Sequence, residues 1–225
     1  MKLEKIISWL DRTLKVADFD DVSNNGLQVG REEGRGMRDE VKVVAFAVDA
    51  SVRAVEAAAQ AGAQLLVVHH GISWGGGIKR LTGGVGNVIR AAMKANLAIA
   101  AYHLPLDAHP TLGNNAQLAK YFGLKKVKPA FSYHGNVIGV IGTNRHGKLI
   151  GICSGGAGEF AEEAKRLGCD LYLTGEASWG DVIAAENCGM KMICAGHYET
   201  EVFGVRALAQ AMKKALKLRT VDLTK

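Results

Sequence analysis

The sequence predicts an α/β fold made of two similar α/β domains with mainly parallel sheets flanked by helices. Short apolar runs such as LLVVHH, residues 65–70, fit strands that are buried on both faces. Between these runs lie stretches whose apolar residues recur at helical spacing, and strands separated by helices imply parallel pairing with right-handed crossovers. The two halves also resemble each other, since EAAAQAGAQLLVVHHGISWGG and EEAKRLGCDLYLTGEASWGD share a helix ending in glycine, a strand and a following Ser-Trp-Gly. This self-similarity indicates a duplication.

In the first half, strands and helices alternate from residue 42 onward. Residues 2–16 place leucines and isoleucines at helical spacing and predict an amphipathic first helix. SNNGLQVG, residues 23–30, contains a short strand-like piece, and the charged, glycine-punctuated residues 31–40 predict an exposed loop. The remaining helices are expected at 51–62, 87–96 and 114–123, and the strands at 42–50, 65–70 and 97–103. Ser51 is expected to cap the second helix, and Gly62 to end it.

A domain boundary is expected at residues 124–136, which contain Pro129 and lack clear periodicity. This predicts a first domain over 1–125 and a second over 126–225, with a last helix at about 200–218 that is able to pack back on the first domain. Strands are expected at 137–142, 148–153, 170–176 and 191–197, and further helices at 159–168 and 181–189.

Composition narrows the class of protein. A chain of 225 residues can bury a good core as one large or two small domains. No apolar run approaches the roughly 18 residues that span a bilayer, and the N-terminus is typical of a helix rather than a signal peptide, so we expect a cytoplasmic protein without a membrane partner. The four cysteines have no CxxC spacing, which favours buried, reduced thiols. The net charge of +6 allows a nucleic-acid partner, but the basic residues are spread out and do not favour one.

Residues that commonly bind metals fall at three strand ends. His69 and His70 end one strand, while His103 ends a second with Asp107 four residues on. His197 ends a third, with Glu201 four residues on. Ligands of open α/β sheets bind outside the carboxyl ends of the strands. These side chains are therefore expected to gather in one cleft if the strands are parallel neighbours or face each other across the two halves. Imidazole with carboxylate suits Zn, Fe, Mn or Co better than Ca, and a carboxylate can bridge two ions.

Each of these residues also has an ordinary structural interpretation. His103 can be a structural histidine, or can orient a ligand or carry protons beside the metals. Asp107 can cap its loop, and an i,i+4 pair such as His197 and Glu201 is common on solvated helix faces.

A second motif lies at residues 156–161, which read GxGxxA between a strand and a helix, with Glu176 twenty residues beyond Gly156. This is the outline of a dinucleotide-binding fingerprint, but glycines are frequent at such turns for steric reasons alone. We prefer a loop whose backbone amides hold a substrate phosphate near the metals, without an organic cofactor.

Seven segments together resemble a known family. In chain order they are SNNGLQVG, VDAS, LLVVHHG, YHLPLDAH, CSGGAG, DLYLTGE and GHYETE. They are similar to the NGG-interacting factor three homologues, also called GTP cyclohydrolase I type 2 homologues, over nearly the whole chain. The resemblance implies two α/β domains of similar topology, a dinuclear metal site between them and ring-like homohexamers. The metal ligands that it implies are His69, His70, Asp107, His197 and Glu201, the last as a bridge.

The resemblance also implies a reaction, which is metal-assisted hydrolysis of a nucleotide-type substrate. Metal-activated hydroxide would attack C8 of guanine, with His103 as the catalytic proton donor or acceptor. Lys79 and Arg80 are candidates for binding the triphosphate. Asn24 stands where many members have aspartate, and Ser178-Trp179 follows TGE where others carry different polar residues. The alternative is a non-catalytic metal-binding interaction or regulatory protein, with or without nucleic acid as its partner.

Overall fold

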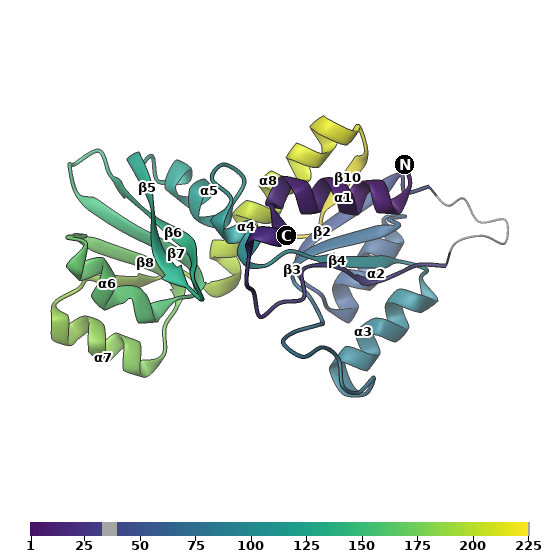
Figure 1. The fold of residues 1–225 in the computed structure, drawn as a ribbon, viewed down its shortest axis with the longest axis horizontal. Coiled ribbons are helices and arrows are strands. Elements are labelled where there is room, and N and C mark those ends of the chain that lie inside the picture. The colour runs from purple at the N-terminus through teal and green to yellow at the C-terminus, as the bar shows by residue number, and fades with distance from the viewer. Residues whose placement is uncertain (33–39, 225) are drawn as a thin grey trace. The chain divides into compact units, whose positions relative to one another are not determined.

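The computed structural model describes residues 1–32 and 40–224, and it confirms the α/β class with two five-stranded sheets flanked by helices (Figure 1). The chain divides into two compact units. Unit 1 comprises Met1–Pro105 and Val205–Lys225, and unit 2 comprises Leu106–Gly204. No helix in the described part of the chain has the length and apolarity needed to cross a membrane.

The sheet of unit 1 is parallel except at one edge. Its strands, in spatial order, are β1 (Gly26–Val29), β4 (Ala98–Ala101), β3 (Leu65–His70), β2 (Val43–Asp49) and β10 (Arg219–Asp222). Only β1 runs antiparallel to its neighbour, β4. The four parallel strands therefore end at one edge, which is where ligands bind in sheets of this kind.

Helices cover both faces of this sheet (Figure 1). Their bounds are α1 (Leu3–Leu14), α2 (Val52–Gln60), α3 (Gly83–Lys94) and α8 (His197–Leu216), the last of which begins in unit 2. The core beneath α2 and α3 contains Ala45 and Ala47 of β2 together with Val55 and Val88 of the helices. Because successive strand residues point to opposite faces, Phe46 points to the face covered by α1 and α8.

The sheet of unit 2 is mixed. Its strands, in spatial order, are β5 (Lys125–Tyr133), β6 (Asn136–Thr143), β7 (Leu149–Gly156), β8 (Leu171–Glu176) and β9 (Met192–Cys194). The first three run antiparallel, whereas β7, β8 and β9 are parallel. The helices of this unit are α5 (Asn114–Tyr121), α6 (Ala161–Arg166) and α7 (Trp179–Cys188), and α4 (Leu104–Ala108) joins the units along the chain. Short 3-10 helices occupy Val16–Asp18 and Gly158–Phe160.

The division between the units falls earlier than the predicted boundary. Residues 106–124 belong to unit 2, since Leu118 and Leu124 pack in one core cluster with Ile150 and Ile152 of β7. The stretch expected to be the domain boundary, residues 124–136, contains the strand β5. Its first half is exposed at successive residues, so the apolar alternation typical of a strand is missing there. The end of α8 belongs to unit 1. The strand β10, which was not predicted, pairs with β2 in the sheet of unit 1.

Two expectations about local structure were wrong. The strand expected to end at His197 stops at Cys194, and His197 instead begins α8 after a turn in which Gly196 has φ +96°. All four cysteines are free, but only Cys153 and Cys169 are buried, while Cys194 is exposed. The predicted loop at 31–40 lies largely outside the described residues.

Candidate functional site

Three histidines of unit 1 lie together at the ends of neighbouring strands. His69 and His70 are the last residues of β3, and His103 follows β4 by two positions. One ligating nitrogen from each lies within 4.8 Å of the other two. The ring centroids of His69 and His70 are 4.6 Å apart, and those of His69 and His103 are 5.1 Å apart. The parallel pairing of β3 and β4 places the three rings at one edge, as the sequence predicted.

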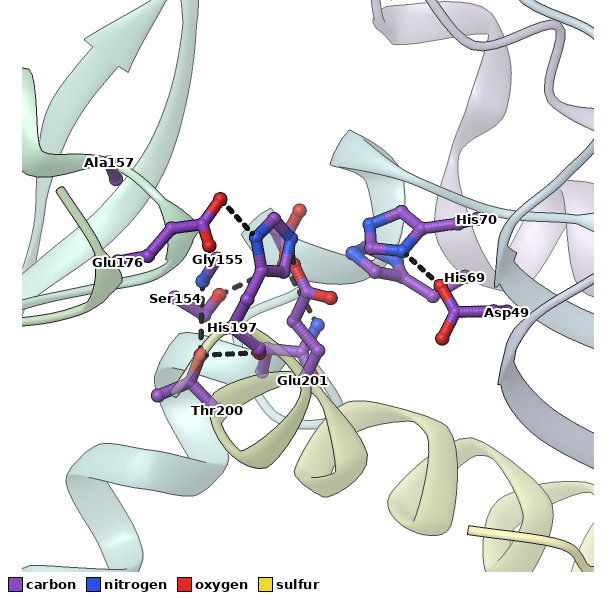
Figure 2. Close-up of polar contacts among 12 residues, drawn as sticks. Asp49, His69, His70, Ser154, Gly155, Ala157, Glu176, His197, Thr200 and Glu201 are labelled. Carbon is purple, nitrogen blue, oxygen red and sulfur yellow. Dashed lines mark hydrogen bonds and ion pairs between the residues drawn. The ribbon is translucent and has the colours of Figure 1, made fainter. Parts of the chain in front are cut away.

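The Nδ1 atoms of His69 and His70 each face an oxygen. His69 Nδ1 lies 2.9 Å from the carbonyl oxygen of Tyr102, and His70 Nδ1 lies 2.9 Å from Asp49 Oδ1 (Figure 2). Because a carbonyl oxygen only accepts hydrogen bonds, His69 donates from Nδ1, and Nε2 then carries the lone pair of the neutral ring. Metal-binding histidines are oriented in this way, by an oxygen on the nitrogen remote from the ion. Both histidines therefore have the geometry of ligands that bind through Nε2.

Asp21 holds His103 from the segment that precedes β1. His103 Nδ1 lies 2.9 Å from Asp21 Oδ1, and the Asp21 side chain is only 2% exposed. The carboxylate also accepts hydrogen bonds from the backbone of Ser23 at 3.0 Å and of Leu104 at 2.9 Å. Burial alone would raise the pKa of Asp21, but the hydrogen bond and charge of His103, with the donors of Ser23 and Asn25, lower it to about 2. Asp21 is therefore an anion that fixes the orientation of the His103 ring.

The glycine after the two histidines allows the Gln28 and Ala101 side chains to approach the backbone closely there. A Cβ on Gly71 would overlap the Gln28 side chain and lie 2.6 Å from the Ala101 methyl. Gln28 Oε1 accepts the backbone N–H of Ile72 at 2.7 Å, which ties the loop to β1. Trp74 Nε1 then donates to the Gly71 carbonyl at 2.9 Å, so the indole is held beside the histidines.

A second set of ligand-type side chains lies in unit 2, at the start of α8. His197 Nδ1 is 3.0 Å from Glu176 Oε1, and its Nε2 is 3.1 Å from Glu201 Oε1 (Figure 2). Glu201 lies one helical turn after His197 and is 3% exposed, whereas Glu176 ends β8 and is 64% exposed. His197 thus repeats the pattern of unit 1, with an oxygen on Nδ1. The early start of α8 places the i,i+4 pair on one helix face, where both side chains can bind the same ion.

Two glycines allow the backbone of unit 2 to approach this pair closely. Gly155 has φ +68°, and a Cβ there would overlap the Glu201 carboxylate. Its N–H donates to Thr200 Oγ1 at 3.0 Å. A Cβ on Gly175 would lie 2.7 Å from Thr200 Oγ1 and 2.8 Å from the Cα of His197. The ends of β7 and β8 therefore pack directly on the first turn of α8.

Asp107 is placed by a different polar network of unit 2. It lies on α4, is 7% exposed, and accepts hydrogen bonds from Asn114 Nδ2 at 2.8 Å and Ser154 Oγ at 3.1 Å. Asn114 is fully buried and also accepts the backbone N–H of Gly204 at 2.7 Å. These contacts fix the Asp107 carboxylate against β7 and α5.

Comparison with known proteins identifies the family. The family model described as Duf34/NIF3 (NGG1p interacting factor 3) matches residues 1–149 and 132–224. The chain belongs to this family. It is 38% identical over 250 residues to a protein of Pyrococcus horikoshii named GTP cyclohydrolase 1 type 2 homolog, in an alignment that covers 98% of this chain and 97% of the relative. A Deinococcus radiodurans protein of the same name is 38% identical over 235 residues, covering 92% of this chain and 86% of the relative.

Solved structures support the same fold. The protein ybgI, described as of unknown function, superposes with a TM-score of 0.83 at 28% identity, covering 99% of this chain and 98% of that structure. The protein TTHA1606 from Thermus thermophilus gives a TM-score of 0.81 at 28% identity, with the same coverage.

Two backbone N–H groups of the glycine-rich segment have partners within unit 2. The N–H groups of Gly155 and Ala157 donate to the hydroxyls of Thr200 and Thr174, at 3.0 Å and 3.2 Å, so neither is directed at a phosphate. Glu176, which the dinucleotide interpretation would place on a ribose, instead contacts His197. Lys79 and Arg80 lie in the loop before α3, where both are exposed.

Sequence reasoning missed the oxygens that orient the histidines. Asp49 lies in the strand predicted at 42–50 and was given no role, and Glu176 was considered only as part of the competing motif. Asp21 carries no local signal, because it lies 82 positions from His103. Asp49 is placed by the strand register of the structure, in which Asp49 and His70 are aligned partners of β2 and β3.

Proposed function

We propose that this NIF3-family chain is a dinuclear metal-dependent hydrolase acting on a nucleotide-type substrate. The five ligands are His69 and His70 from unit 1 with Asp107, His197 and Glu201 from unit 2. These residues would hold two divalent ions, each of them Zn, Fe, Mn or Co, and Glu201 would be shared by both.

The observation that carries this proposal is the oxygen on Nδ1 of four histidines. In His69, His70, His103 and His197 this oxygen lies 2.9 to 3.0 Å away. Three of these histidines are proposed ligands, and metal-binding histidines almost always have such a partner, because it fixes both the tautomer and the ring plane. On His103 the same arrangement orients the proposed proton donor or acceptor.

The donor atoms also suit first-row divalent ions. His197 Nε2 and Glu201 Oε1 are 3.1 Å apart, which is close to the roughly 3.4 Å between two ligands that each lie about 2.1 Å from a tetrahedral ion. Imidazole with carboxylate suits Zn, Fe, Mn or Co, and Ca prefers oxygen alone.

Each residue then has a distinct task in hydrolysis. When bound, the metals supply hydroxide at neutral pH by lowering the pKa of water from 15.7 to about 7. His103 donates or accepts the proton of the reaction, and the buried Asp21 anion holds its ring through Nδ1, which leaves Nε2 for that proton. Glu176 and Asp49 hold the rings of His197 and His70 in place.

Metal analysis of protein purified without chelator tests the ligand assignment. We expect two ions per chain, the loss of one in His69→Ala and the loss of both in Glu201→Ala. The matched control is His146→Ala, because His146 is an exposed histidine far along the chain from these clusters. Metal content that is equally low in the control, or unchanged in Glu201→Ala, contradicts the assignment.

The reaction is tested separately with metal-loaded protein. Opening of the guanine ring of GTP supports a cyclohydrolase. If GTP stays intact while phosphate is released from other nucleotides or esters, the hydrolase assignment survives without that specificity. A third result favours a regulatory protein. In that case the metal-loaded protein turns over none of these substrates, and its affinity for DNA falls with salt but does not change when a chelator removes the metals.

The family resemblance supports a further proposal, which is assembly into a homohexamer. From the sequence we also propose a cytoplasmic location. Light scattering coupled to size-exclusion chromatography measures the assembly directly, and a mass of one or two chains contradicts the hexamer.

A further inference from the structure

Unit 1 has a cavity of about 430 Å³ beside its histidine cluster. Its walls come from the loop after β2, the loop after β3 and the first turns of α3, and they include Ser51, Ile72, Trp74, Val85 and Asn87. Its size lies within the roughly 300–1,000 Å³ typical of small-molecule sites. The carboxyl ends of parallel strands, where this cavity opens, are the usual location of such sites.

The cavity adjoins the histidines directly. Ala50 and Gly71, which line it, follow Asp49 and His70 in the chain. The Trp74 ring centroid lies 6.1 Å from that of His70 and 5.1 Å from that of His103. A group bound in the cavity would therefore lie next to the side chains that the proposed function uses.

The lining selects an uncharged ligand. None of the ten residues that line the cavity has an ionisable side chain. Trp74 provides an aromatic surface that is 38% exposed. Its indole is held in place by the hydrogen bond to the Gly71 carbonyl. Aromatic side chains held in this way bind flat rings by stacking.

One polar side chain favours a heteroaromatic ring over an aliphatic chain. Asn87 lines the cavity, and its Oδ1 accepts a hydrogen bond from Arg90, which orients the amide. The amide Nδ2 can then donate to a ring nitrogen or carbonyl. An aliphatic ligand would use neither the indole face nor this donor.

We propose that this cavity binds the nucleobase of the substrate, with Trp74 as the stacking surface and Asn87 as a hydrogen-bond donor. The inference rests on the proposed function, since it supplies the ring recognition for that reaction. The charged phosphates of the substrate are bound outside this cavity.

Guanosine is the probe, because it has a purine base and no charge. Its dissociation constant is measured by ligand-detected NMR titration against the full chain, with ribose as the control ligand. We expect saturable binding of guanosine and none of ribose. Trp74→Leu should weaken guanosine binding roughly 5- to 150-fold, the range for losing one base–aromatic stack, while Trp74→Phe keeps most of the affinity.

A matched pair of glycine variants separates the cavity from the indole. A Cβ on Gly84 or Gly76 meets no atom within 4 Å, and neither glycine has a positive φ, so both tolerate a side chain. Only Gly84 lines the cavity. Gly84→Leu should abolish guanosine binding by filling the cavity, and Gly76→Leu should bind it like the unchanged protein.

The outcomes distinguish this inference from the proposed function, because metal content is measured on the same samples. Equal guanosine affinity in Gly84→Leu and Gly76→Leu overturns the base site, as does the absence of guanosine binding to the unchanged protein. Neither result affects the metal assignment. The base site is supported if Gly84→Leu no longer binds guanosine while its metal content and its thermal unfolding stay unchanged.

Discussion

Replacement of Asp49 by alanine should weaken metal binding about tenfold. Asp49 contacts His70 at Nδ1, 2.9 Å away, and is not itself a proposed ligand, so the substitution changes a group that orients a ligand. Loss of such a partner typically costs 10- to 100-fold in metal affinity. The Asp49 side chain is 54% exposed, so water screens the interaction and replaces part of it. The lower end of the range, about tenfold or roughly 1.4 kcal/mol, is therefore expected.

The assay is competition between the protein and a chromophoric chelator for Zn or Co. Glu56→Ala is the control, because it removes one carboxylate from an exposed position on α2 and leaves the histidines untouched. The metal affinity of Asp49→Asn should lie between those of Asp49→Ala and Glu56→Ala. The amide oxygen still accepts the hydrogen bond from Nδ1, but it carries no charge. If Asp49→Ala binds metal as tightly as Glu56→Ala, the oxygen on Nδ1 does not orient a ligand, and the main support for the metal assignment is lost.

Three further predictions concern other parts of the molecule. In metal-free protein the pKa of Asp21 is lowered to about 2, so its ionised form stabilises the folded chain above about pH 4, and this stabilisation is lost as the pH falls toward 2. The urea midpoint of the unchanged protein should therefore approach that of Asp21→Asn as the pH falls from about 4 to about 2. A constant difference between the two midpoints would contradict the ionisation. Gly155→Ala should lower both the metal content and the free energy of unfolding, because its Cβ would overlap Glu201. The control is Gly168→Ala, where the backbone is also left-handed but nothing lies within 4 Å of the added Cβ; it should cost only about 1–2 kcal/mol in urea unfolding and keep its metal. Equal metal content in the two variants would argue against the close approach to Glu201. A thiol reagent followed by mass spectrometry should modify Cys194 in the folded protein but not Cys153, because burial raises the pKa of Cys153 well above its ordinary value; rapid modification of Cys153 would contradict its position in the core.

Strands buried on both faces were the easiest elements to predict. Residues 65–70 form β3 at the predicted bounds, because four apolar residues followed by two polar ones leave little choice of strand end. The strand β5 was missed, since only Phe131 among its residues is buried and its exposed half has no alternation to detect. Edge strands of this kind are specified by pairing with a neighbour, here β6, and that pairing leaves no local pattern.

The start of α8 shows why a correct residue can be placed on the wrong element. KMICAGH reads as a strand ending in histidine, but Gly196 takes φ +96° and turns the chain before His197. A glycine before a histidine is compatible with either conformation, so the sequence could not separate them. The consequence for chemistry is large. Only on a helix does the i,i+4 spacing bring His197 Nε2 to 3.1 Å from Glu201 Oε1.

The histidines were predictable and their oxygen partners were not, because the partners depend on strand register. Asp49 faces His70 because β2 and β3 are aligned with these two residues as direct partners. A shift of one residue would place Ala50 there and turn the Asp49 side chain to the other face of the sheet. Val44 to Val48 are apolar and nearly uniform in burial, so periodicity alone cannot choose between the two registers. The register places Ala45 and Ala47 beneath α2 and α3, and a shift of one residue would put the larger Val44 and Phe46 there instead. The orientation of a proposed metal ligand therefore depends on two alanines on a strand that carries no ligand of its own.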